Sequence, residues 1–171
     1  MMVYRVGIDP RGRVLLILAD EQVTQLLPMV IGQFEARAIA MELAEERFER
    51  PLTHDLLHNV ISTLGHRLER VDITKLENGV YYAELTLVGE NDIVKVDSRP
   101  SDAIALALRA GAPIYVAEEI LERERVLPED IVIDGETPER EEETTTEEEQ
   151  KNIEQVRRLL ESLDLDEGQD Q

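Results

Sequence analysis

The chain has 171 residues, a hydrophobic fraction of 42% and a formal net charge of −20. It contains no cysteine, which excludes disulfides, thiolate zinc sites, iron–sulfur clusters and cysteine nucleophiles. The net charge disfavours long-range attraction of nucleic acid, because that binding depends largely on neutralising phosphates. No stretch approaches the roughly 18–20 apolar residues that span a bilayer. We therefore expect a cytoplasmic protein with no membrane segment.

The distribution of charge and apolar residues divides the chain into a body and a tail. Residues 1–135 contain the apolar segments that a core requires, so they are predicted to form one domain. Residues 136–150 are rich in Glu, Thr and Arg, and they are predicted to be an acidic disordered linker. Apolar residues at helical spacing predict a short amphipathic helix over 151–165, which could dock on the body, on a partner subunit or on another protein. The remaining residues, 166–171, are predicted to be a disordered end.

The first predicted elements are three strands and a helix. Apolar residues over 3–8 and 14–19 flank a turn at Asp9-Pro10, which predicts a β-hairpin. A third strand is predicted over 26–31, and its Pro28 restricts it to an edge or a bulge. Gly32 then opens a helical pattern that continues to about residue 47.

A second helix is predicted over residues 53–64. Thr53 is the expected N-cap, and Gly65 is the expected C-cap. Its apolar side chains recur at helical spacing, so we expect them to form a buried stripe. That stripe contains Leu56, Leu57, Val60, Ile61 and Leu64.

The rest of the body predicts a hairpin and further alternation of strands and helices. The pair Asn78-Gly79 between two alternating runs is a strong hairpin signal. The sequence as a whole therefore predicts an α+β fold, a mixed sheet with packed helices. The further expected elements are strands 68–73, 80–88, 93–96 and 113–116, and helices 102–109 and 117–124.

An internal similarity links the two halves of the body. Residues 30–43 and 94–108 each lead from a strand into a helix that contains Ala-Ile-Ala, at a constant offset of 65. One explanation of this similarity is convergence, because small residues suit a helix packed closely on a sheet. We favour the alternative, a duplicated strand–strand–helix unit.

Two segments, 50–57 and 97–106, contain more polar side chains than folding requires. Both enter a predicted helix through an Arg-Pro pair. Helix caps and favourable interactions with the helix dipole explain part of this polarity. The residues that this structural interpretation explains are Thr53, Asp55, Ser101 and Asp102.

The same segments also contain the components of a phosphodiester hydrolase. Asp97 and Asp102, joined by Glu35 from the related half, could bind Mg²⁺ or Mn²⁺, which prefer oxygen ligands. Such a metal activates water and stabilises charge on a phosphate. His54 is the candidate general acid or base, and Asp55 is the candidate for orienting it. The candidate catalytic residues are thus His54, Asp55, Asp97 and Asp102.

Phosphate binding needs cationic and hydrogen-bonding groups near these carboxylates. Arg50 and Arg99 could hold a phosphate through two parallel hydrogen bonds. Thr53 and Ser101 lie at predicted helix starts, where free backbone N–H groups attract anions.

These segments, RPLTHDLL at 50–57 and DSRPSDAIALA at 97–107, resemble the signature stretches of the bifunctional nuclease domain family. LPMVIG at 27–32, EARAIA at 35–40 and APIYV at 112–116 are also similar to that family. The resemblance covers roughly residues 3–130. It implies a compact α+β domain and nuclease activity on both RNA and DNA.

Three functional hypotheses follow. The first is a metal-dependent nuclease that cleaves RNA and DNA without strong base specificity. The second is a non-catalytic binding module that recognises a protein partner or an anionic ligand. Nucleic-acid binding without cleavage is the third, and the charge of −20 disfavours it unless metals bridge. Assembly into a homo-oligomer is a further expectation, because small sheet domains often pair.

Overall fold

A computed structural model describes residues 1–131 of the chain. Internal contacts divide the chain into two units, Met1–Thr137 and Pro138–Gln171, and the described residues all belong to the first. Three predicted segments lie outside the described residues: the linker 136–150, the helix 151–165 and the end 166–171.

The N-terminal residues form a three-stranded antiparallel sheet in the order β1-β2-β3. Its strands are β1 (Met2–Ile8), β2 (Val14–Ala19) and β3 (Leu26–Val30). The predicted edge position of Pro28 is confirmed, because β3 is an edge strand of this sheet. Proline has no N–H for a ladder hydrogen bond, and an edge strand tolerates that loss.

A second, four-stranded sheet has the order β6-β5-β4-β7. It contains β4 (Arg67–Glu77), β5 (Val80–Val88), β6 (Ile93–Ser98) and β7 (Ile114–Val116). Strands β4, β5 and β6 are antiparallel, whereas β7 pairs with β4 in parallel, so the sheet is mixed. The predicted hairpin is confirmed, and both residues of its Asn78-Gly79 turn have positive φ angles, 51° and 78°.

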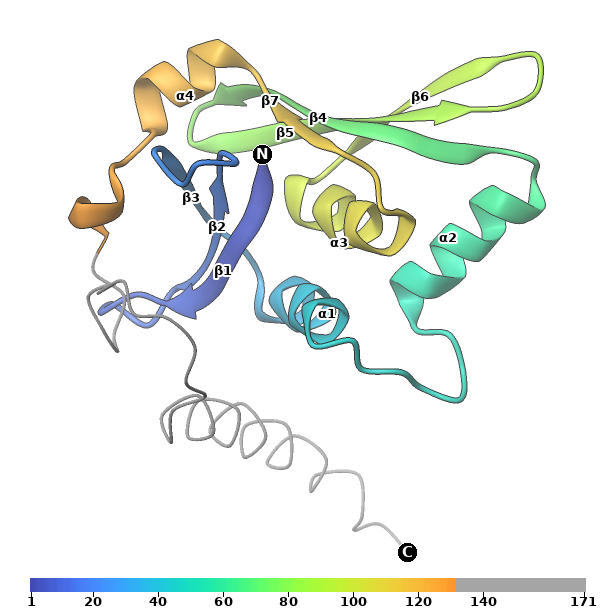
Figure 1. Cartoon of the computed structure of the whole chain (residues 1–171), viewed down its shortest axis with the longest axis horizontal. Helices are drawn as coiled ribbons and strands as arrows, with labels where there is room; N and C mark the ends of the chain where they lie inside the picture. Colours follow the sequence, from blue (N-terminus) through green and yellow to red (C-terminus); the bar gives the residue numbers. More distant parts are fainter. Residues whose placement is uncertain (132–171) are drawn as a thin grey trace, which may run out of the picture. The chain divides into compact units, whose positions relative to one another are not determined.

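Helix α3 (Pro100–Ala110) occupies the centre of the domain. Figure 1 shows α3 against one face of the four-stranded sheet, and α1 (Gln33–Leu43) and α2 (Thr53–Thr63) both pack against α3. Residues 103–107 are all buried, so α3 is covered on every side. Its small Ala-Ile-Ala-Leu-Ala sequence permits that close packing.

A short helix, α4 (Glu118–Glu124), and a 3₁₀ turn, Pro128–Asp130, complete the described residues. The α+β class predicted from the sequence is therefore confirmed. Within the described region, no helix is long and apolar enough to cross a membrane.

The largest differences between predicted and observed helix boundaries are at the end of α1 and the start of α3. Helix α1 ends at Leu43, before the predicted residue 47, and Glu45 then turns the chain with a φ of 54°. Helix α3 begins at Pro100 because proline has a helical φ and needs no hydrogen-bond acceptor at that position. Leu52 is the N-cap residue of α2, and Arg99 is the N-cap residue of α3. The predicted caps Thr53 and Ser101 are instead first-turn residues.

The predicted apolar stripe of α2 is mostly exposed. Of its five members only Ile61 is buried, with 7% of its surface accessible. Helix α2 packs mainly on α3 and β4, so described residues cover only a narrow line of its surface. The four exposed members are Leu56, Leu57, Val60 and Leu64.

The two halves of the domain share an order of elements. Strands β2 and β3 lead into α1, and the antiparallel pair β5 and β6 leads into α3. Convergence and duplication both produce such an order, so the internal duplication stays a prediction.

Candidate functional site

The first turns of α2 and α3 bring His54 and Asp102 together. The distance from His54 Nε2 to Asp102 Oδ1 is 3.2 Å, although 48 residues separate the two in sequence. The side chain of His54 is only 12% exposed, and that of Asp102 is 29% exposed. Because the Asp102 carboxylate accepts a hydrogen bond, it favours the imidazole tautomer with its proton on Nε2. Nδ1 of His54 is then the ring nitrogen that can accept a proton.

Arg99 joins this pair to a second carboxylate on α1. Its Nε donates to Asp102 Oδ2 at 2.6 Å, and its Nη2 lies 2.7 Å from Glu35 Oε1. The hydrogen bond with Asp102, followed by the charge of Asp102 and the contacts of Glu35, raises the pKa of Arg99 above its ordinary value. Gly32 leaves room for Glu35, since a Cβ at Gly32 would collide with the Glu35 carboxylate.

We call Glu35, His54, Arg99 and Asp102 the His54 cluster. It combines a shielded imidazole, two carboxylates and a guanidinium that is 67% exposed. The guanidinium still has N–H groups outside its two ion pairs, because five donors share the arginine head. The cluster therefore offers both a proton acceptor and an anion-binding group at one surface.

Asp55 has other partners than the predicted one. Its Oδ1 accepts from Arg109 Nε at 2.5 Å, and its Oδ2 accepts from the N-cap N–H of Leu52 at 2.8 Å. His54 and Asp55 are consecutive on a helix, so their side chains project about 100° apart. The prediction that Asp55 orients His54 is therefore wrong, because Asp102 is the carboxylate that contacts the imidazole.

Arg109 is a buried charge that the sequence analysis missed. Its side chain is 5% exposed, and its Nη1 donates to the backbone oxygens of Ala105 at 2.8 Å and Ala38 at 3.2 Å. Together with Asp55, these acceptors tie α3 to both α1 and α2. The available signal was a lone charge at the end of an apolar Ala-Leu helix, although a last-turn arginine is also ordinary.

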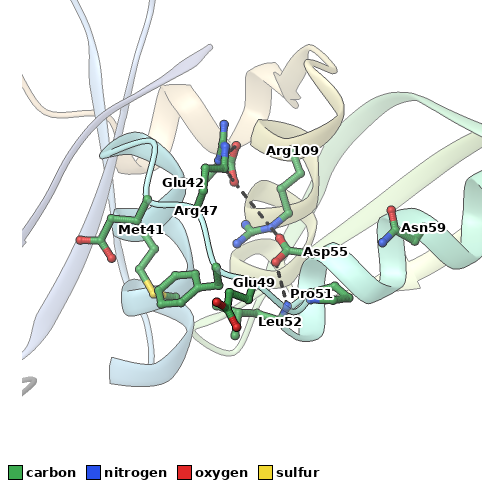
Figure 2. Close-up of a pocket in the computed structure, with 11 residues that line it drawn as sticks. Met41, Glu42, Arg47, Glu49, Pro51, Leu52, Asp55, Asn59 and Arg109 are labelled. Atoms are coloured by element: carbon green, nitrogen blue, oxygen red, sulfur yellow. Dashed lines mark hydrogen bonds and ion pairs between the residues drawn. The ribbon is translucent and has the colours of Figure 1, made fainter.

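A pocket of about 290 Å³ opens beside Asp55 and Arg109. Figure 2 shows the guanidinium of Arg109 pointing toward Asp55 at the wall of this pocket. The lining also includes Glu42, Glu46 and Glu49, and none of the His54 cluster contributes to it. Four carboxylates around two arginines do not suit a polyanion, so the pocket is not the phosphate site that the chemistry requires.

The other predicted site residues lie apart from the cluster. Asp97 is exposed on β6, directly opposite Glu84 of β5, and its side chain has no hydrogen bond or ion pair within residues 1–131. Arg50 and Thr53 are exposed at the entrance to α2. Ser101 is 7% exposed, which removes its hydroxyl from a phosphate at the surface.

The predicted metal ligands do not assemble. Across the described part of the chain, no three His, Asp or Glu side chains gather in a group that could hold a metal ion. Glu35 and Asp102 do lie near each other, but the guanidinium of Arg99 occupies the space between their oxygens. The donor set of Glu35, Asp97 and Asp102 therefore does not fit a divalent cation as it stands.

Replacing Asp55 with asparagine is expected to destabilise the domain at neutral pH by on the order of 1 kcal/mol. Burial raises the pKa of Asp55, but Arg109, the Leu52 N–H and the charge of His54 outweigh it and lower the pKa below its ordinary value. A lowered folded-state pKa gives stability above the unfolded pKa, about 3.9, that is lost as pH falls through the folded value. Urea unfolding at pH 7 and pH 2.5 should show a difference between wild type and Asp55→Asn that is smaller at the lower pH. An equal difference at both pH values would contradict an ionic role for Asp55.

Comparison with known proteins identifies relatives along most of the chain. Residues 16–129 match the family described as the bifunctional nuclease domain. A protein of Mycobacterium tuberculosis named Uncharacterized protein Rv1829 is 39% identical over 159 residues, which cover 93% of this chain and 90% of the relative.

Plant nucleases match a shorter region. Bifunctional nuclease 2 of Arabidopsis thaliana is 31% identical over 94 residues, and Bifunctional nuclease 1 of Oryza sativa subsp. indica is 29% identical over 98 residues. These matches cover 53% and 56% of this chain but only 29% and 30% of the plant proteins. The family match spans β3 to β7, α1 to α4 and every member of the His54 cluster, but not β1. The chain thus belongs to the bifunctional nuclease domain family.

Proposed function

We propose that this domain is a nuclease that hydrolyses phosphodiester bonds of RNA and DNA without strong base specificity. The observation that carries the proposal is the contact of His54 with Asp102, 3.2 Å long, on a carboxylate that also binds Arg99. The family and the plant relatives named as nucleases support it.

Each member of the cluster has a role in the proposed hydrolysis. His54 accepts a proton through Nδ1 from the water whose oxygen bonds to phosphorus, while Asp102 holds the ring and stabilises the imidazolium that forms. The bond from phosphorus to the leaving oxygen breaks in the same displacement, and that oxygen takes a proton from solvent. Arg99 donates its remaining N–H groups to a non-bridging phosphate oxygen and stabilises the charge that develops there. Glu35 positions Arg99 from the other side. These groups read only the phosphate, which fits cleavage without base specificity.

Dependence on Mg²⁺ or Mn²⁺ is a separate part of the proposal. Glu35 and Asp102 supply the carboxylate oxygens that such ions prefer, but Arg99 now binds both. The roles of His54 and Arg99 above require no metal. Addition of metal or chelator therefore tests the metal prediction without deciding the role of His54.

The experiment is cleavage of labelled single-stranded RNA and DNA of mixed sequence by the purified chain, with Mg²⁺, with Mn²⁺ and with chelator. Asp102→Asn, prepared in parallel, should reduce cleavage by on the order of 10²-fold, because the imidazole loses its orienting charge. Asp97→Ala tests the predicted metal role of Asp97 in the same series. Equal cleavage by wild type and Asp102→Asn would indicate contamination and sink the proposal. In that case the non-catalytic binding module becomes the better hypothesis.

A further inference from the structure

Strand β6 is an edge strand with an open outer side. No strand of the described residues pairs with it beyond β5. All five residues from Ile93 to Asp97 are exposed, and their hydrophobic members Ile93, Val94 and Val96 are 68%, 38% and 37% exposed. An edge strand with free N–H and C=O groups and apolar side chains is a template for pairing with another strand.

The hairpin turn determines which backbone groups face outward. Gly89 N donates to Asp92 O at 2.9 Å, and β5 pairs with β6 from Val88↔Ile93 onward without a shift. Hydrogen-bonded and non-hydrogen-bonded pairs alternate along an antiparallel ladder. The backbone groups of Ile93, Lys95 and Asp97 therefore point away from β5. They are available to an incoming strand.

The charges on β6 are incompletely paired. Lys95 Nζ lies 2.6 Å from Glu84 Oε1 on the neighbouring strand. Asp97 lies directly opposite the same Glu84, an unfavourable pair of like charges. An additional cation beside Asp97 would neutralise this arrangement. Within the described residues Asp97 has no such partner.

We propose that β6 pairs with β6 of a second copy of this chain, antiparallel about a two-fold axis at Val96. In this register Lys95 lies opposite the partner's Asp97, and Asp97 lies opposite the partner's Lys95. The outward-facing backbone groups of both residues then form the new ladder hydrogen bonds. The two four-stranded sheets become one continuous sheet of eight strands.

Charge complementarity selects this register over its neighbours. Only residues with outward-facing backbone groups can pair directly, so allowed registers differ by steps of two residues. A register with the two-fold axis at Lys95 places the two lysines directly opposite each other, which is destabilising. A register with the two-fold axis at Val94 leaves Asp97 beyond the end of the partner's β6. The register centred on Val96 satisfies both charges.

The second copy also covers apolar surface. Val96 is directly opposite Leu85 on β5, and Leu85 belongs to the buried core with α3, so Val94 and Val96 lie on the helix-bearing face. Pairing about Val96 brings the two Val96 side chains side by side and places Val94 of each copy opposite the partner's Ser98. The two Val96 side chains form a non-hydrogen-bonded pair, in which Cα atoms are about 4.5 Å apart.

Cysteine trapping tests the position of the axis. The chain has no native cysteine, so Val96→Cys introduces a single thiol that meets only its own copy. Under mild oxidation this variant should form a disulfide-linked dimer of the full chain, because the paired Cα atoms fall within disulfide range. Val80→Cys is the matched control, since Val80 is a 55% exposed valine at the other end of β5. Crosslinking of Val96→Cys no faster than of Val80→Cys would overturn the proposal.

Charge exchange tests the register. Analytical ultracentrifugation of the wild-type chain should show a dimer. Lys95→Glu and Asp97→Lys should each raise its dissociation constant by about tenfold or more, because each creates two contacts between like charges. The double variant with both substitutions should restore dimerisation, since opposite charges again face each other.

Circular dichroism and urea unfolding of each variant establish that the monomer stays folded. A monomeric wild-type chain overturns the proposal outright. A dimer that survives both single substitutions unchanged also overturns it, because the interface then lies elsewhere. None of these measurements depends on nuclease activity, so the dimer and the proposed function succeed or fail separately.

Discussion

Replacing His54 with asparagine is expected to lower the rate of RNA and DNA cleavage by about 10²–10⁴-fold, the usual contribution of a general acid or base. Asparagine keeps a polar group that can hydrogen-bond to Asp102 but cannot accept the proton. The measurement is the initial rate of cleavage of a labelled oligonucleotide, together with the free energy of unfolding of both proteins. The rate should fall while the stability stays nearly constant.

The matched control is His58→Asn. His58 is one turn further along α2 and makes no side-chain hydrogen bond or ion pair within residues 1–131. This variant should cleave at the wild-type rate. A similar loss of cleavage rate in both variants would show that the loss comes from reduced stability or from differences between protein preparations. It would refute the assignment of His54 as the general base.

Replacing Arg109 with methionine is expected to destabilise the domain by about 3 kcal/mol, because three hydrogen bonds of its guanidinium are removed, each contributing about 1 kcal/mol. Methionine fills a similar volume, but it cannot donate the hydrogen bonds that Arg109 gives to Asp55 Oδ1 and to the carbonyls of Ala38 and Ala105. The measurement is urea unfolding at pH 7. Combining Arg109→Met with Asp55→Asn should cost less than the two single losses added together, since the orphaned charge is also removed.

Arg67→Ala is the control for this substitution. Arg67 is 65% exposed on β4, where its ion pair with Glu69 is open to solvent. Its loss should change the free energy of unfolding by no more than about 0.5 kcal/mol. An effect of Arg109→Met as small as that of Arg67→Ala would contradict the view that Arg109 connects the three helices.

Local patterns in the sequence were sufficient for most of the fold. The Asn78-Gly79 turn, the proline at the edge of β3 and the glycine after α2 each act through backbone conformation, which a short stretch of sequence determines. The exposed stripe of α2 could not be predicted in this way. Periodicity shows which side of a helix is apolar, but only the tertiary arrangement decides whether another element covers that side.

The site shows the same division between local and long-range information. The sequence singled out Glu35, His54, Arg99 and Asp102 as chemically reactive residues, and the fold brings them together from three helices. The sequence did not indicate that Asp102, and not Asp55, contacts His54, since both are acidic residues in the first turn of a helix. It also missed Arg109, whose burial results from long-range packing of α1, α2 and α3.

The position of Arg99 between two carboxylates has a kinetic consequence. In the free domain its positive charge is already balanced by Glu35 and Asp102, within a chain of net charge −20. If the domain acts as proposed, a polyanion approaches a chain of net negative charge whose Arg99 is already paired, so electrostatic steering, which can accelerate association by 10–10³-fold, is not expected. Capture depends on ordinary diffusion followed by a local exchange, in which a phosphate competes with carboxylates for the same guanidinium. On the proposed function, such a site therefore meets its substrates without the gain in association rate that a positively charged surface gives.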